Sequence, residues 1–192
     1  MIKLENDKKI WLSSDFHFFH NREFIYRPRG FESVYEMNEV IVENWNKIVN
    51  NEDICFVLGD IMLNNNIGGL ELLKSLRGHI FIIAGNHDTA ARIDLYKQCW
   101  NVEGVVDALA IDYKKHHFFL SHYPSFTGNL EKEALSQMTI NLYGHTHQKT
   151  NFYNDIPFMY HVGVDSHNCA PVLLDNIIRE CYAKVEECKD ML

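Results

Sequence analysis

Five short apolar segments of this sequence each end in a polar cluster that contains aspartate, asparagine or histidine. The segments are rich in isoleucine, valine, leucine and phenylalanine, and each is shorter than a typical helix, so each predicts a buried strand. They occupy residues 9–14, 53–58, 79–84, 116–121 and 139–143. Ligands of open α/β sheets bind outside the carboxyl ends of the strands, so we expect these clusters to converge at one crevice.

Helical patterns separate several of these segments. Apolar residues recur every three or four positions over 34–49, and Ser33 followed by Glu36 is typical of a capping box at the start of a helix. The remaining elements that we expect are helices at 70–76, 90–99 and about 174–188, and strands at 105–112 and 158–163. Strands that alternate with helices predict an α/β protein whose sheets are covered by helices.

Length and composition favour a single domain over residues 1–192. Hydrophobic residues make up 46% of the chain and charged residues 23%, which is typical of a globular domain, and no linker or internal repeat interrupts it. No apolar run approaches the ~20 residues that cross a bilayer, so we expect no membrane insertion. The amino terminus lacks a signal-peptide pattern and the five cysteines form no close Cys-x-x-Cys pair, which together favour a cytoplasmic protein.

The formal charge of −8 argues against an extended nucleic-acid track, because such tracks use lysine and arginine to neutralise phosphates. Bound divalent cations would still concentrate positive charge in one place and attract a phosphate there. A small phosphate-bearing substrate therefore remains compatible with an acidic chain.

The polar clusters supply oxygen and nitrogen ligands. In chain order they are Asp15-Phe-His17, Gly59-Asp60, Gly85-Asn86-His87-Asp88, His122 and Gly144-His145-Thr-His147. Residues i and i+2 of an extended segment point the same way, so we expect Asp15 and His17 to face one site, as do the two histidines of the last cluster. The glycines that open three of the clusters would let the backbone turn sharply as it leaves the strand.

Carboxylates, an amide oxygen and imidazoles, without a thiolate, form a mixed ligand set. Such a set suits manganese, iron, zinc or nickel rather than a cysteine-based structural zinc, and it exceeds what one ion requires. We therefore expect two divalent metal ions. A shared carboxylate would hold them about 3.5–4 Å apart, the spacing at which two metals clamp a phosphoryl group and ionise a bridging water.

The order and content of the clusters resemble the calcineurin-like metallophosphoesterase superfamily, whose pattern is D-x-H, G-D, G-N-H-D/E, a lone H and G-H-x-H. The resemblance extends from Asp15 to at least His147. It implies a layered α-β-β-α sandwich with two mixed sheets flanked by helices and an active site at the strand carboxyl ends. Within the superfamily, "DFHFFHNREFI", the early "RP" and the late "VGVD" resemble the small bacterial and phage-type phosphoesterases.

The resemblance also implies roles for the cluster residues. Six would hold the two metal ions: Asp15, His17 and His147 one, and Asn86, His122 and His145 the other. Asp60 would bridge the ions. His87 would stabilise the phosphoryl oxygens or protonate the leaving group, with Asp88 as its orienting partner.

The expected activity is hydrolysis of phosphodiester bonds, or of phosphomonoesters, by a hydroxide that bridges two metal ions, with manganese favoured. A nuclease or cyclic-nucleotide phosphodiesterase that acts on small nucleotides is one alternative, and a protein-binding scaffold of the same fold is another. A Ser/Thr protein phosphatase fits poorly, because "GDIMLNNN" lacks the D-R-G turn of those enzymes. The sequence leaves the oligomeric state open.

The segment 18–31 has no clear periodicity and contains three arginines, which either form a solvated face or bind a substrate phosphate. Arg27 and His20 are the candidates for substrate contact. Among the aromatic residues, Tyr26, Tyr123 and Phe126 are placed where a base or an aryl group would stack.

Overall fold

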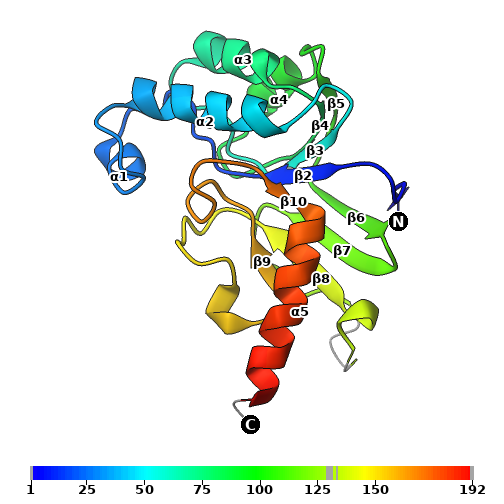
Figure 1. Ribbon diagram of the computed structural model, residues 1–192. Helices are drawn as coiled ribbons and strands as arrows, with labels where there is room; N and C mark the ends of the chain where they lie inside the picture. Colours follow the sequence, from blue (N-terminus) through cyan, green and yellow to red (C-terminus); the bar gives the residue numbers. More distant parts are fainter. Residues whose placement is uncertain (1, 129–131, 133, 191–192) are drawn as a thin grey trace.

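The computed structural model describes residues 2–128, 132 and 134–190, which form two mixed five-stranded sheets flanked by helices (Figure 1). The first sheet has the order β10 (Val172–Leu173), β2 (Ile10–Ser13), β3 (Ile54–Val57), β4 (His79–Ile83) and β5 (Val102–Val106). The second has the order β1 (Ile2–Lys3), β6 (Ala108–Tyr113), β7 (His116–Ser121), β8 (Thr139–Tyr143) and β9 (Met159–His161). The expected α/β class with two mixed, helix-flanked sheets is confirmed.

Three helices connect the parallel strands of the first sheet: α2 (Val34–Ile48), α3 (Asn66–Ser75) and α4 (Ala90–Tyr96). They lie together along one side of that sheet, whereas α5 (Leu174–Asp190) runs beside the second sheet (Figure 1). The remaining helical segments are short: α1 (Glu23–Tyr26), η1 (Leu135–Gln137) and η2 (Tyr153–Asp155). None of the described helices combines the length and the apolar run that crossing a bilayer requires.

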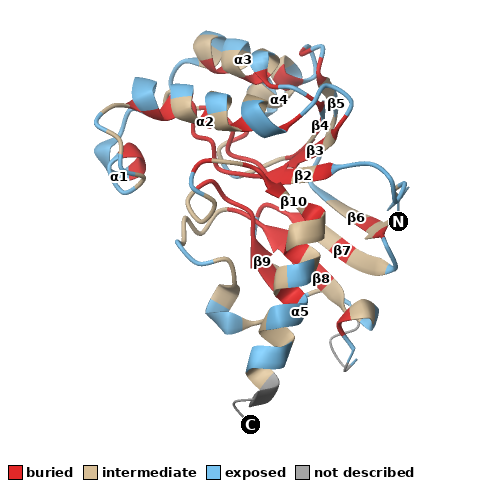
Figure 2. Cartoon of the chain, viewed as in Figure 1, coloured by how far each residue is buried: buried red, intermediate tan, exposed pale blue. Residues whose placement is uncertain are grey.

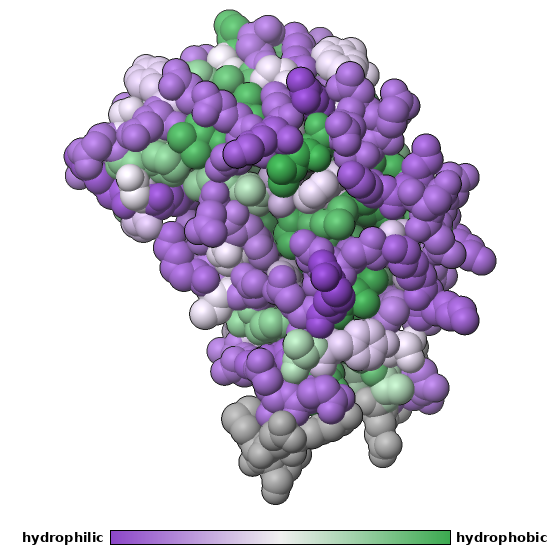
Figure 3. All heavy atoms as spheres, viewed as in Figure 1, coloured by the Kyte–Doolittle hydropathy of each residue, from purple (hydrophilic) through white to green (hydrophobic). Residues whose placement is uncertain are grey.

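Apolar side chains form two core clusters. One joins the two sheets and α5, and it includes Leu12 of β2, Phe118 of β7 and Ile177 of α5. The other packs the buried face of α2, with Ile41 and Trp45, against the first sheet. Buried residues accordingly follow the strands and the inner faces of the helices in Figure 2, while the face seen in Figure 3 is mostly hydrophilic. The sheets therefore form a rigid base for the segments at their carboxyl ends.

The expected elements are found, with two corrections. Residues 105–112 do not form one strand, because the chain leaves the first sheet after Val106 and enters the second at Ala108. A period-two pattern marks extended backbone but does not show a change of sheet. The capping box is half formed: Ser33 Oγ accepts a hydrogen bond from the amide of Glu36 at 3.2 Å, but the Glu36 carboxylate accepts from the amide of Glu32 instead.

Candidate metal centre

All the predicted metal ligands follow the carboxyl ends of strands, and the structure brings them together. Strands β2, β3 and β4 of the first sheet lead into Asp15, Asp60 and Asn86, respectively. Strands β7 and β8 of the second sheet lead into His122 and the segment 144–147. Each sheet contributes parallel neighbours whose ends meet at the same edge. The site therefore lies where the carboxyl edges of the two sheets meet.

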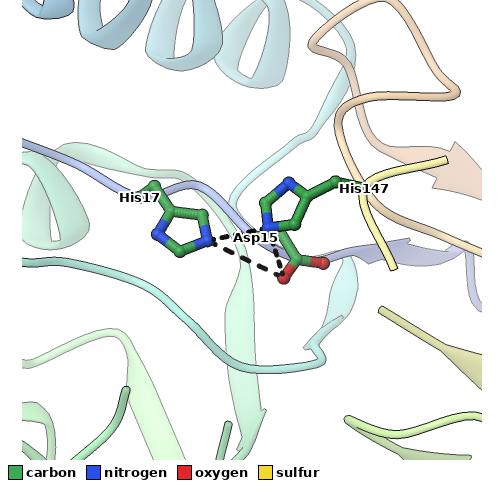
Figure 4. A group of neighbouring side chains, drawn as sticks. All are labelled: Asp15, His17 and His147. Carbon is green, nitrogen blue, oxygen red and sulfur yellow. Dashed lines mark hydrogen bonds and ion pairs between the residues drawn. The ribbon is translucent and has the colours of Figure 1, made fainter. Parts of the chain in front are cut away.

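Asp15, His17 and His147 form the first ligand group (Figure 4). The Nε2 atoms of the two histidines are 3.2 Å apart, and Asp15 Oδ1 lies 4.0 Å from that of His17 and 3.9 Å from that of His147. The other carboxylate oxygen of Asp15 accepts hydrogen bonds from Ser14 Oγ at 2.5 Å and from the amide of His145 at 2.9 Å. Asp15 Oδ1 is buried without a hydrogen-bond partner among the described residues, and it faces the two imidazoles.

Asn86, His122 and His145 form the second ligand group. Asn86 Oδ1 lies 2.9 Å from His122 Nε2 and 2.9 Å from His145 Nδ1. Asp60 lies between the two groups, because its Oδ2 is 3.5 Å from His122 Nε2 and 3.7 Å from His17 Nε2. The amide of His87 donates a hydrogen bond of 2.8 Å to Asp60 Oδ1, which leaves Oδ2 directed at the imidazoles.

The hydrogen bonds of the His122 ring indicate that this arrangement needs a cation. His122 Nδ1 donates to the carbonyl of Leu58 at 2.7 Å, so a neutral His122 ring presents a lone pair at Nε2. That lone pair faces Asn86 Oδ1, another acceptor, at 2.9 Å. Ligands about 2.1 Å from a shared ion lie roughly 3 Å from one another, so a cation would satisfy both atoms. The residues fit divalent metal ions.

Burial and nearby charges set the pKa values of the site. Burial, reinforced by the charge of Arg29, lowers the pKa of His17 well below its usual value, so its imidazole is neutral and can act as a ligand at neutral pH. Burial raises the pKa of Asp60, although the neighbouring His122 opposes that shift. A cation beside this poorly solvated carboxylate would stabilise its charged form.

The backbone at the ligands is not extended, contrary to the expectation for Asp15-Phe-His17 and for the last cluster. The residues with a φ in the left-handed region are Asp15 (59°), His17 (51°), Asp60 (56°), His145 (67°) and His147 (49°). Such angles are uncommon for residues other than glycine and cluster at functional sites, where the surrounding structure enforces them. The paired ligands face one site because the chain curls, rather than because residues i and i+2 share a strand face.

Glycine is required before three of the ligands for two different structural reasons. Gly59 has a φ of +85°, so it provides the expected sharp turn. Gly85 and Gly144 have no such angle, and they are needed because other groups approach closely. A Cβ at Gly85 would lie 2.6 Å from the amide nitrogen of Asp60, and one at Gly144 would lie 2.5 Å from Asp15 Oδ2.

The buried ion pair of Arg29 and Asp165 holds the His147 ring on the side away from the other two residues of the first ligand group. Neither residue of the pair was among the predicted site residues. His147 Nδ1 donates to Asp165 Oδ2 at 2.9 Å, and Arg29 donates to both oxygens of Asp165, from Nε at 3.0 Å and from a terminal nitrogen at 2.8 Å. Arg29 also donates to the carbonyls of Asp15 and Phe16. Such partners fix the tautomer of a metal-binding histidine and leave Nε2 free for the ion.

The electrostatics of this ion pair are mutual. Burial alone would raise the pKa of Asp165, but the hydrogen bond from His147 and the charge of Arg29 lower it well below its usual value. Burial alone would lower the pKa of His147, but the hydrogen bond to Asp165 and the charge of Asp15 raise it. The late "VGVD" segment contains Asp165, and Arg29 is one of the three arginines noted in the segment 18–31.

The Asp88 carboxylate was expected to orient His87, but its hydrogen bonds go to other groups. The carboxylate accepts hydrogen bonds from the amides of Asp60 and Gly85 at 2.8 Å each, from the amide of Ile61 at 3.3 Å, and from the hydroxyl of Tyr96 at 2.7 Å. Asp88 therefore ties the turn after β3 to the turn after β4. Its four partners hold two of the ligand-bearing segments in register with each other.

A pocket of about 460 Å³ opens beside the ligands. Its described lining consists of His17, His20, Phe24, Ile25, Asp60, Asn86, His87, His145 and His147. His20 lies in this lining, as the expected substrate contact requires, but Arg27 does not, because its guanidinium pairs with the exposed Glu32. The expectation for Arg27 is therefore not supported by its position.

Of the aromatic residues expected to stack a base or aryl group, Tyr26 is buried in the core and unable to do so. The ring of Tyr123 lies against His145 at 4.6 Å between centroids, and that of Phe126 against Phe158 at 6.4 Å. Neither is part of the described pocket lining, whereas Phe24, which the sequence did not single out, is.

Known proteins that are similar to this chain include two by sequence and one by structure. An uncharacterized protein of Methanocaldococcus jannaschii is 33% identical over 183 residues, which cover 90% of both chains. The Gene 66 protein of Mycobacterium phage D29 is 26% identical over 202 residues, which cover 93% of this chain and 98% of the phage protein. The crystal structure of a protein of unknown function from Aquifex aeolicus has the same fold, with a TM-score of 0.67 at 22% identity over 90% of this chain and 99% of that one.

A family model described as the calcineurin-like phosphoesterase superfamily domain matches residues 9–163. The matched stretch begins at the first strand of the crevice and includes every predicted metal ligand from Asp15 to His147 as well as His87. The chain therefore belongs to the calcineurin-like phosphoesterase superfamily.

Proposed function

We propose that this protein is a binuclear metal-dependent phosphoesterase whose substrates are phosphodiesters. The observation that carries the proposal is the position of Asp60 Oδ2, which lies 3.7 Å from His17 Nε2 in one ligand group and 3.5 Å from His122 Nε2 in the other. A carboxylate between two groups of ligands is suited to bridge two ions about 3.5–4 Å apart.

The proposed ligands divide between two ions that share Asp60. Asp15, His17 and His147 would hold one ion, and Asn86, His122 and His145 the other. The donors are oxygen and imidazole without a thiolate, a set that suits manganese, iron, zinc or nickel, and manganese is the ion that we propose. When bound, the two ions would lower the pKa of a water molecule and neutralise charge on the phosphoryl oxygens.

His87 is proposed as the residue that protonates the departing alcohol. Its Nε2 lies 3.9 Å from Asp60 Oδ2, and its side chain is 42% exposed and lines the pocket that would receive the ester. Hydrolysis adds water to phosphorus and breaks one bond from phosphorus to an alcohol oxygen, so the leaving oxygen needs a proton. A half-exposed imidazole at the edge of the metal centre can deliver that proton.

The charges around the pocket favour a diester over a monoester. Among the described residues of the lining, none is lysine or arginine. A phosphomonoester carries close to two negative charges at neutral pH, and a diester carries one. A site that has no lysine or arginine beside its two ions suits the singly charged ester, and His20 is then placed to contact its neutral part.

The test is metal analysis combined with hydrolysis of matched esters. We expect two metal ions per chain after reconstitution with manganese, and manganese-dependent hydrolysis of bis(p-nitrophenyl) phosphate that exceeds hydrolysis of p-nitrophenyl phosphate. Asn86→Ala should lose metal and turnover together. His87→Ala should retain both ions and lower kcat by about 10²-fold or more on an alkyl diester, with a smaller loss on a nitrophenyl ester, whose leaving group needs no proton.

His79→Ala is the matched control, because His79 pairs with Glu103 at the opposite end of β4 from the ligands. It should leave metal content and both activities unchanged. Loss of metal in His87→Ala would refute the division of roles. A protein that binds no metal and cleaves neither ester would refute the enzyme and favour a protein-binding scaffold of the same fold.

A further inference from the structure

Phe24 is an exposed aromatic residue at the mouth of the metal centre. It belongs to α1 and is 70% exposed, whereas the next two residues, Ile25 and Tyr26, are only 7% and 8% exposed. Ile25 and Tyr26 pack into the core cluster beneath α2 and so fix the short helix in place. The fold thus holds one large apolar ring in water beside the pocket, although burying such a ring would be favourable.

The rings of the pocket form a continuous aromatic wall. The ring of Phe24 meets that of His20 edge to face at 5.8 Å between centroids, and His20 in turn lies 5.1 Å from His17 and 6.1 Å from His87. The wall therefore extends from a proposed metal ligand and the proposed acid to the exposed Phe24. A group attached to a phosphate at the metal centre would lie along this wall.

Three of the arginines near this wall are engaged by protein groups, and a fourth, Arg22, is close enough to His20 to lower its pKa but is not part of the described pocket lining. Arg27 pairs with Glu32, and Arg29 pairs with Asp165. Arg92 donates hydrogen bonds to the carbonyl of His87 and to the side chain of Asn66. Apart from Asp60 and Asn86, which are proposed metal ligands, the described lining of the pocket consists of rings and an isoleucine, which favours a neutral, flat group over a second phosphate.

We infer that the pocket binds an uncharged planar ring carried by one alcohol of the phosphodiester, and that Phe24 is the specificity-determining residue on which this ring stacks. The inference rests on the proposed function. Stacking on an aromatic side chain suits an aryl group and a nucleobase equally, because both present a flat π face. A volume of about 460 Å³ lies within the range of pockets that hold small organic ligands.

The test uses the full chain loaded with manganese and three diesters with similar leaving alcohols: dibenzyl, bis(cyclohexylmethyl) and dimethyl phosphate. We expect wild-type protein to prefer dibenzyl over bis(cyclohexylmethyl) phosphate by about 5-fold or more in kcat/KM, mainly through KM. Phe24→Ala should remove this preference by raising the KM for dibenzyl phosphate much more than the KM for dimethyl phosphate, and Phe24→Tyr should restore it. A dithymidine monophosphate arm shows whether a nucleobase or only an aryl ring is accepted.

Trp100→Ala is the matched control, because Trp100 is 72% exposed and lies just before β5, at the amino end of that strand. It should leave the ring preference intact. An equal loss on all three esters in Phe24→Ala, or a preference that survives this substitution, would overturn the inference while leaving the hydrolase intact. Calorimetric binding of dibenzyl phosphate that depends on Phe24 without turnover would instead support the subsite and refute the proposed hydrolysis.

Discussion

Replacing Asp165 with asparagine tests whether the buried ion pair behind His147 sets the metal affinity. The Asp165 side chain is 4% exposed and that of Arg29 is 1% exposed, so neither can recover hydrogen bonds from water. Asparagine keeps the shape but turns one acceptor into a donor. That donor must then face an N–H of either Arg29 or His147, and the charge of Arg29 loses its partner.

The magnitude follows from burial. Removing one partner of a buried ion pair destabilises a protein by about 3–5 kcal/mol, and asparagine retains one acceptor, so we expect a loss of about 3 kcal/mol in the free energy of unfolding. Metal affinity should fall by about 10- to 100-fold, because His147 loses the acceptor that fixes its tautomer. The two effects have separate readouts, urea unfolding of metal-free protein and titration with manganese.

Asp112→Asn is the control for a carboxylate that pairs with a histidine at the surface. Asp112 pairs with His117, but these side chains are 32% and 38% exposed, so the loss in stability should stay below about 1 kcal/mol with no change in metal affinity. Our reasoning fails if the Asp165 variant binds manganese as tightly as wild-type protein, or if the two variants lose the same stability.

Three further predictions concern other parts of the site. Gly144→Ala should abolish metal binding in a manganese titration, because the new Cβ would clash with the Asp15 carboxylate of the first ligand group. Gly104→Ala is the control and should bind manganese normally, because its new Cβ would meet open space. Tyr96→Phe removes one of four hydrogen bonds to the buried Asp88 carboxylate and should lower the free energy of unfolding by about 1.5–3 kcal/mol while the enzyme stays active; an unchanged urea midpoint would contradict it. Burial lowers the pKa of His161 to about 4. As the pH falls, this histidine therefore binds a proton in the unfolded chain before it does so in the folded protein. The effect should lower the free energy of unfolding by up to about 3 kcal/mol between pH 6.5 and 4. Thermal unfolding in a chelator checks this last prediction, and a melting temperature that stays flat over that range would count against it.

The sequence predicted the fold well where the signal is local. Apolar runs and helical periodicity located the main strands and helices, and Ser33 marked the start of α2. It failed where a short element exists only because a neighbour pairs with it. Strands β1 and β10 each span two residues and are held by β6 and β2, respectively, and the change of sheet at Asp107 leaves no mark on the alternating pattern.

The sequence also identified which residue types would meet, but not the backbone that brings them together. The ligand set was predicted from the order of the polar clusters, because that order resembles the calcineurin-like superfamily. The left-handed backbone of Asp15 and Asp60 was not predictable, since it is imposed by hydrogen bonds between segments, such as the one from the Asp60 amide to Asp88.

The sequence by itself determined the chemistry: strands that end in carboxylates and imidazoles, in the order of one phosphoesterase superfamily. Only the tertiary structure decided which of several chemically similar residues lie at the site. Arg27 and Arg29 are two positions apart, yet only Arg29 reaches Asp165. Phe24, Ile25 and Tyr26 are consecutive apolar residues, yet only Phe24 is left exposed beside the pocket. The physical reason is that side-chain burial depends on contacts between segments far apart in the sequence, which no local pattern specifies.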